Sequence, residues 1–124
     1  MIEDRKTLGQ KIEKFPMWDL VEVQEGEKTV FKMSRKFVAK SFKHALDFIA
    51  AAGIIAETME HHPDLHVTDF RNVEVVIYTH TLGGLTDNDF ALAKSIDESA
   101  LVTYSPKWLK EHPSANFSSA TLLC

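Results

Sequence analysis

The hydrophobic pattern in the first third of the chain predicts a helix followed by two strands. Within residues 4–15, Leu8, Ile12 and Phe15 recur at helical spacing, and we expect a short helix that ends near Pro16. The next segments, MWDLVEVQ and KTVFKMSRKFV, are rich in strand-forming residues, and the second alternates as a strand does. The QEGEK segment between them supplies a glycine for a turn, which predicts a β-hairpin.

The strongest helical signal covers residues 42–62, where apolar residues form two stripes. Ser41 is in position to cap the N-terminus, and Pro63 cannot continue a helix, so we expect the helix to end near His61 and His62. A helix that is apolar on two sides is usually buried on two sides, which indicates a partner subunit. The stripe expected in the core comprises Phe42, Ala45, Leu46, Ile49, Ala52, Gly53 and Ala56, and the second comprises Phe48, Ala51 and Ile55.

The rest of the chain predicts a strand, a helix and a tail. NVEVVIYTH is β-branched and alternating, and DLHVTDF before it is expected to add a short strand. The helix that follows begins with Thr86 and Asp89 in the spacing of a capping box. The predicted order is α-β-β-α-β-β-α, an α+β fold. We expect one domain over residues 1–104 and a poorly ordered tail over 105–124, which docks through Trp108, Leu109 or Phe117.

Composition and charge exclude several classes of protein. A length of 124 residues suits a single domain, and a net charge of -4 argues against a surface built for nucleic acid. The first ten residues lack the apolar region of a secretory signal, and no apolar run is long enough to span a bilayer. Cys124 is the single cysteine, which excludes an intrachain disulfide and a cysteine-based zinc site. We expect a cytoplasmic protein, small enough to enter the nucleus, with no membrane or direct nucleic-acid partner.

The segment ETMEHHPDLH concentrates three of the six histidines, and a metal site is the first interpretation to consider. Histidines four residues apart on a helix bind zinc, and His62 and His66 have that spacing. Pro63 lies between them and breaks the helix, so the spacing does not place both side chains on one face. We therefore predict no metal site.

Proton transfer fits this segment better. On a helix, Glu57, Glu60 and His61 share one side, and a carboxylate beside an imidazole fixes its tautomer and raises its basicity. His80 ends the next predicted strand, so imidazoles from two element ends are expected to converge on a small cleft that donates and accepts protons. The shortage of nucleophiles favours proton-shuttling elimination or isomerisation over covalent catalysis.

A purely structural interpretation of the same histidines stands beside this one. The helix dipole favours a histidine at a helix C-terminus, so His61 and His62 need no function to be there. His44, His66 and His112 are expected to be solvated bystanders, the last because it lies in the tail.

The spacing of these residues resembles the pterin-4a-carbinolamine dehydratase family over roughly residues 5–103. The motif of that family contains, in order, an acidic residue, a His-His-Pro triplet, an aromatic residue, a third histidine and an aspartate, and this sequence has the same order. In this sequence these positions are Glu57, His61, His62, Pro63, Phe70, His80 and Asp89. Trp18 and the KFVAKSF segment also resemble the N-terminal half of the family.

The resemblance implies a fold and an activity. The fold is a four-stranded antiparallel sheet with helices packed on one face, assembled into dimers or tetramers. The activity is a hydro-lyase reaction without metal or organic cofactor: dehydration of 4a-hydroxytetrahydropterin, such as 4a-hydroxytetrahydrobiopterin, to quinonoid dihydropterin and water. This recycles the pterin cofactor of aromatic amino acid hydroxylases. The alternative function is a protein-interaction module, because some family members act as the dimerisation cofactor of a transcription factor.

The resemblance also assigns roles to residues. His61 and His80 are expected to be the acid and base, in an order that the sequence leaves open. His62 is the third expected catalytic residue, which orients the substrate and can serve as a third proton carrier. Glu57 is expected to support His61, and Asp89 has both a supporting and a capping role open to it. The full substrate-binding set is expected to be Glu60, His61, His62, Pro63, Tyr78, Thr79, His80 and Thr81, with backbone groups of 78–81 contacting the pterin edge.

Overall fold

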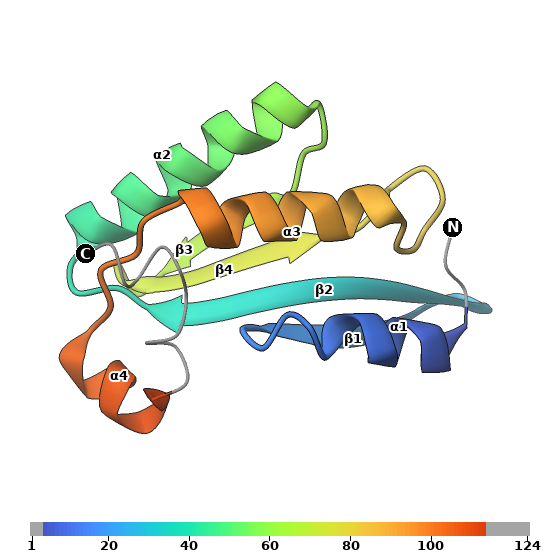
Figure 1. Cartoon of the computed structure of the whole chain (residues 1–124), viewed down its shortest axis with the longest axis horizontal. Helices are drawn as coiled ribbons and strands as arrows, with labels where there is room; N and C mark the ends of the chain where they lie inside the picture. Colours follow the sequence, from blue (N-terminus) through green and yellow to red (C-terminus); the bar gives the residue numbers. More distant parts are fainter. Residues whose placement is uncertain (1–3, 114–124) are drawn as a thin grey trace.

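A computed structural model describes residues 4–113, which form helices and strands in the predicted order, followed by one further short helix (Figure 1). The elements are α1 (Arg5–Ile12), β1 (Trp18–Glu25), β2 (Lys28–Val38), α2 (Phe42–Met59), β3 (Asp64–Thr68), β4 (Asn72–Ile77), α3 (Asp87–Ser99) and α4 (Pro106–Glu111). Within the described residues, no helix is both long enough and apolar enough to cross a membrane.

The four strands form one antiparallel sheet in the order β1-β2-β4-β3. Residues that face each other on neighbouring strands lie on the same face of a sheet. One such row crosses all four strands on the face that the helices cover, and it consists of Trp18, Arg35, Val75 and Leu65. Helices α2 and α3 lie side by side across that face (Figure 1). The predicted α+β fold, a four-stranded antiparallel sheet with helices on one face, is confirmed.

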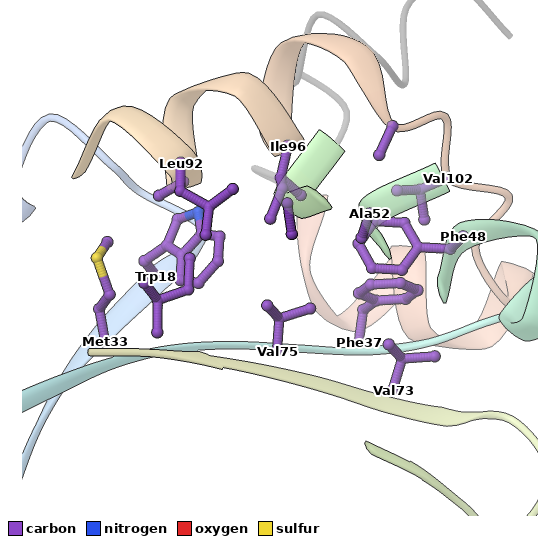
Figure 2. Close-up of a cluster of buried hydrophobic side chains, with 14 of the residues drawn as sticks. Trp18, Met33, Phe37, Phe48, Ala52, Val73, Val75, Leu92, Ile96 and Val102 are labelled. Carbon is purple, nitrogen blue, oxygen red and sulfur yellow. The ribbon is translucent and has the colours of Figure 1, made fainter. Parts of the chain in front are cut away.

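The core lies between this face of the sheet and the helices (Figure 2). Alternate residues of β2 and β4 point into it, as the period of two requires. They are Met33, Phe37, Val73, Val75 and Ile77, and they meet Phe48 and Ala52 from α2 and Leu92 and Ile96 from α3. Phe37 meets the edge of the Phe48 ring, with centroids 4.9 Å apart.

Helix α2 buries a narrower stripe than its sequence predicts. The buried positions are Ala45, Phe48, Ala52 and Ala56, whereas Phe42 and Leu46 are 50% and 45% exposed. The prediction that Phe42 and Leu46 belong to the core stripe is therefore wrong, because the small alanines determine which side lies against the sheet. Phe48, assigned to the second stripe, is a core residue.

A buried arginine ties the sheet to the C-terminal part of the domain. Arg35 is fully buried, and it donates to Asp97 Oδ1 and to the Tyr104 hydroxyl, each over 2.8 Å. Asp97 also accepts the indole N–H of Trp18 at 3.0 Å. Burial raises the pKa of the Asp97 carboxyl, and the nearby Arg35 opposes that rise. Nothing in the sequence pattern predicted this pair, since an arginine in an alternating strand is ordinarily solvated.

The described part of the expected tail is a docked helix. Ser105 accepts the backbone N–H of Trp108 and so caps α4, whose first residue is a proline. The Trp108 ring stacks on Tyr104, with centroids 4.9 Å apart, and approaches Phe37 edge-on. The expected docking through Trp108 is thus observed. The disorder expected for the remainder and the docking of Phe117 fall on residues 114–124, outside the described residues.

Candidate functional site

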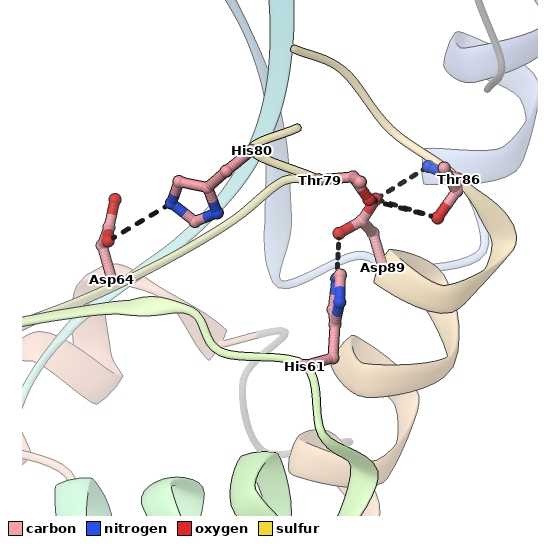
Figure 3. Close-up of polar contacts among 6 residues, drawn as sticks. All are labelled: His61, Asp64, Thr79, His80, Thr86 and Asp89. Atoms are coloured by element: carbon pink, nitrogen blue, oxygen red, sulfur yellow. Dashed lines mark hydrogen bonds and ion pairs between the residues drawn. The ribbon is translucent and has the colours of Figure 1, made fainter. Parts of the chain in front are cut away.

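The end of α2 determines where the first histidine points. Glu60 adopts a left-handed conformation with φ of 54° and ψ of 38°, and the backbone N–H of His61 bonds back to Ala56 O at 3.1 Å. This is the geometry that commonly terminates helices, although glycine usually occupies the left-handed position. The turn takes His61 out of the helix and directs it toward the start of α3 (Figure 3).

Asp89 is the centre of the polar contacts at this site. Its carboxylate is fully buried in the first turn of α3. One oxygen accepts the backbone N–H of Thr86 at 2.7 Å and the hydroxyl of Thr79 at 2.8 Å. The other accepts from His61 Nε2 at 2.5 Å (Figure 3). One side chain therefore joins the starts of α3 and β3 to the end of β4. Asp89 has the expected capping role, and its bond to His61 is the contact that the predicted supporting role requires.

The pairing with Asp89 fixes the tautomer of His61. An ionised carboxylate accepts hydrogen bonds and donates none, so Nε2 of His61 carries the proton. The second ring nitrogen, Nδ1, is then the one without a proton, and it has a lone pair that can accept a hydrogen bond. The His61 side chain is 20% exposed, so part of the imidazole is accessible from solvent.

Glu57 has a different partner from the one predicted. Its carboxylate accepts from His62 Nε2 at 2.8 Å, and both side chains are well exposed. The prediction that Glu57 supports His61 assumed that the helix continues through residue 61. Because α2 ends at Met59, the i, i+4 relation is lost, and Asp89 supports His61 instead.

His80 is held on the opposite side of the chain from Asp89. Its ring packs on Tyr78, with centroids 4.0 Å apart, and its Nε2 lies 3.8 Å from Asp64 Oδ1. The ammonium of Lys32 lies 4.2 Å from the centre of the Tyr78 ring. Figure 3 shows His80 directed at Asp64, while the preceding Thr79 faces Asp89. Sequence reasoning missed Asp64 and Lys32, whose contacts arise between strands that are distant in the sequence.

Backbone groups of the loop that follows β4 form hydrogen bonds within the loop. The Thr79 N–H bonds to Gly84 O at 2.7 Å, and the Thr79 carbonyl accepts from Leu82 and Gly83. The N–H and the carbonyl of Thr79 are therefore engaged within the loop, and the carbonyl of His80 accepts a further bond from the Gly83 N–H at 3.3 Å. The expectation that backbone groups of residues 78–81 contact the substrate stays a prediction.

The structure brings some of the predicted residues together and leaves others apart. His61, Thr79 and Asp89 are in direct contact, and His80 is adjacent through the chain. His62 pairs with Glu57 on the exposed side, and Glu60 is exposed at the helix end. Pro63 leads directly into β3. Over residues 4–113, no three His, Cys, Asp or Glu side chains are grouped so as to hold a metal ion.

Comparisons with known proteins point to one family. Residues 3–99 match the family model described as pterin 4 alpha carbinolamine dehydratase. The Arabidopsis thaliana protein named pterin-4-alpha-carbinolamine dehydratase 2, mitochondrial, is 42% identical over 87 residues, which cover 70% of this chain but only 44% of that protein. A protein of Chelativorans sp. (strain BNC1) named for the same dehydratase is 34% identical over 94 residues, 76% of this chain and 89% of its own length.

A solved structure shares the fold. It is described as a transcriptional coactivator/pterin dehydratase from Brucella melitensis, and it superposes with a TM-score of 0.68 at 25% identity. The match covers 81% of this chain and 99% of that one.

Replacing Asp89 with alanine removes the acceptor for four donors, one of them the part-buried backbone N–H of Thr86. We expect Asp89→Ala to lower the free energy of unfolding by about 2–4 kcal/mol, measured by urea denaturation. Asp87→Ala is the matched control, because Asp87 lies in the same helical turn but is exposed, and within residues 4–113 its ion-pair partner is Lys11. It should change stability by about 0.5 kcal/mol or less. Equal losses in the two variants would contradict the central role of Asp89.

Proposed function

This chain belongs to the pterin-4α-carbinolamine dehydratase family, and we propose that it dehydrates a 4a-hydroxytetrahydropterin to quinonoid dihydropterin by histidine acid–base catalysis. Family membership supports the dehydratase activity itself, a hydro-lyase reaction on a pterin. The roles of individual histidines, the recycling of a hydroxylase cofactor and the oligomeric state are our inferences from the geometry.

The reaction requires two proton transfers at neighbouring atoms. The bond between C4a and the hydroxyl oxygen breaks while an acid protonates that oxygen, which leaves as water. The proton on N5 goes to a base, and a double bond forms between C4a and N5. Imidazole is suited to both steps, since its pKa lies near neutral pH.

The observation that carries this proposal is the bond between His61 and the buried Asp89. Burial and the hydrogen bond hold the imidazole in one orientation with Nδ1 free. When Nδ1 accepts a proton, the imidazolium forms next to a carboxylate, and this pairing stabilises the charged form. Because the carboxylate is already in place before the reaction begins, it stabilises the transient imidazolium without any rearrangement of the protein. Such preorganised electrostatic stabilisation is usually the largest contribution to enzymatic rate enhancement.

His80 supplies the second proton carrier. Asp64 at 3.8 Å gives its protonated form a nearby opposite charge, and packing against Tyr78 restricts rotation of its ring. The pterin would lie between the two imidazoles, with His62 at the exposed rim. The product is an oxidised pterin that needs only reduction to return to tetrahydropterin, which suits recycling of the cofactor of an aromatic amino acid hydroxylase.

Removal of either proton carrier should slow the chemical step. We expect His61→Ala and His80→Ala each to lower kcat by about 10² or more, as measured by the absorbance of the quinonoid product. His66→Ala is the matched control, because His66 is an exposed histidine on β3 whose cross-strand neighbour is Glu74. It should retain wild-type turnover. Near-wild-type rates for both site variants would overturn the assignment.

The outer side of α2 supports self-association. Phe42, Leu46 and Ile54 lie along one stripe of this helix and are 50%, 45% and 69% exposed. A contiguous apolar stripe on a helix is the kind of surface that a symmetric copy covers. We therefore propose a homodimer or homotetramer that buries this stripe.

The oligomeric state tests this assembly and separates it from the alternative function. We expect sedimentation to show an oligomer for the wild type and for Lys43→Glu, and a monomer for Leu46→Glu, which places a charge in the interface. A monomeric wild type would leave the stripe open to another protein. That result would favour the interaction module, a role consistent with the coactivator description of the Brucella structure.

A further inference from the structure

An open groove lies between the end of α1 and the first half of α3. Its volume is about 290 Å³, and neither His61 nor His80 lines it, so it is separate from the histidine site. One wall comes from α1 and the turn after it, with Lys11, Lys14 and Phe15, and the other comes from α3, with Asp87, Phe90 and Lys94.

The floor of the groove is aromatic and is held in place. The rings of Phe15 and Phe90 are tilted against each other, with centroids 5.4 Å apart. The turn that ends α1 fixes Phe15, because its backbone N–H donates to Ile12 O at 2.8 Å and its carbonyl accepts from the Trp18 N–H at 2.9 Å. Phe15 keeps part of its surface exposed. The floor therefore offers a preformed apolar contact for one large side chain of a partner.

The rim of the groove is basic, although the chain as a whole has a net charge of -4. Lys14 and Lys94 are exposed and lie on opposite walls. Within residues 4–113, Lys14 has no ion-pair partner, and Lys94 lies 3.9 Å from Glu98 in an exposed pair that contributes little. The lysine stems can lie along apolar surface while their ammonium groups stay in water. The rim is thus a local reversal of the sign of the protein's charge.

The third lysine shows which chemical group this rim accepts. Lys11 Nζ donates to Asp87 Oδ1 at 2.9 Å, and the same ammonium lies 5.3 Å from the centre of the Phe90 ring. A carboxylate is therefore already seated beside the aromatic floor. The Asp87 side chain is 83% exposed, so a carboxylate from a partner can take its place at Lys11.

We propose that this groove is a docking site for an acidic segment of a partner protein, in which one aromatic side chain is flanked by aspartate or glutamate. The aromatic side chain would pack on Phe15 and Phe90, and the carboxylates would pair with Lys14 on one wall and Lys94 on the other. A buried aromatic anchor supplies most of the affinity in such interfaces, and complementary charge fixes the orientation of the partner. The groove is distinct from the apolar stripe of α2, so the proposal does not depend on the oligomeric state.

The groove favours an acidic peptide over a small molecule or a nucleic acid. Its volume is at the lower limit of the roughly 300–1,000 Å³ that small-molecule sites occupy. The exposed ammonium groups come from two walls, which suits a segment that carries several carboxylates. Nucleic acid is bound by a continuous basic face. Here Asp87 interrupts the lysines, and α3 continues with the acidic residues Asp97 and Glu98.

The test measures binding of a short fluorescein-labelled peptide, one phenylalanine with glutamates on both sides, to the full chain by fluorescence anisotropy. We expect saturable binding that weakens as salt is added. In a Lys14→Glu, Lys94→Glu variant the affinity should fall about tenfold or more, because two attractive charge pairs become repulsive. In Asp87→Ala the affinity should rise about two- to threefold, because the carboxylate that competes for Lys11 is removed.

Lys107→Glu is the matched control, because it makes the same change of charge on an exposed lysine of α4, away from α1 and the start of α3 (Figure 1). It should bind the peptide as the wild type does. A second peptide, with alanine in place of the phenylalanine, should bind the wild type about tenfold more weakly, because the aromatic anchor is lost.

Several outcomes would overturn the proposal. They are no binding to the wild type, equal binding of the alanine peptide, an equal loss of affinity in Lys107→Glu, or no gain in Asp87→Ala. Tighter binding of a single-stranded oligonucleotide that requires Lys14 and Lys94 would assign the groove to nucleic acid instead. A change in the sedimentation of the double lysine variant would assign it to a second copy of this chain.

Discussion

A single buried carboxylate holds the site together. Asp89 has no contact with solvent, and a buried charge is costly unless it is fully hydrogen-bonded. Its partners come from three separate segments: Thr86 at the start of α3, Thr79 after β4 and His61 after α2. Each of these segments is an element end that would otherwise be free to vary. Satisfying one charge therefore fixes the relative positions of three loops.

The hydrogen bonds to Asp89 determine the positions of His61 and His80. His61 is bound to Asp89 directly, which fixes its tautomer. Thr79 is bound to the same carboxylate, and the next residue along the extended chain points the other way. His80 is thus directed toward Asp64, with Tyr78 packed on its ring. One carboxylate therefore positions His61 directly and His80 through the neighbouring Thr79.

Local signals in the sequence were sufficient for most of the fold. The Ser41 cap, the glycine in the hairpin turn and the Thr86–Asp89 spacing act over a few residues, and each lies where it was expected. The side of α2 that faces the sheet was harder to predict, because the helix is apolar around much of its circumference. In the structure the stripe that contains the small alanines packs against the sheet and is buried, whereas Phe42 and Leu46 are exposed.

Contacts across the fold account for what the sequence did not show. The left-handed Glu60 ends α2 two residues before His62, and as a result Glu57 pairs with His62 while His61 pairs with Asp89. Helical spacing alone could not reveal it, since the spacing argument presumes that the helix continues. The burial of Arg35 similarly depends on Asp97 and Tyr104, which lie more than sixty residues away in the sequence.

Proton transfer by side chains, without a metal ion, is the central claim, and the wild-type protein tests it directly. The measurement is the rate of dehydration of 4a-hydroxytetrahydropterin, followed in a stopped-flow instrument, with and without a strong chelator. We predict a rate far above the spontaneous reaction that the chelator leaves unchanged. Loss of activity with chelator and its return on adding a divalent metal would contradict the histidine mechanism, and a rate equal to the spontaneous one would contradict the activity itself.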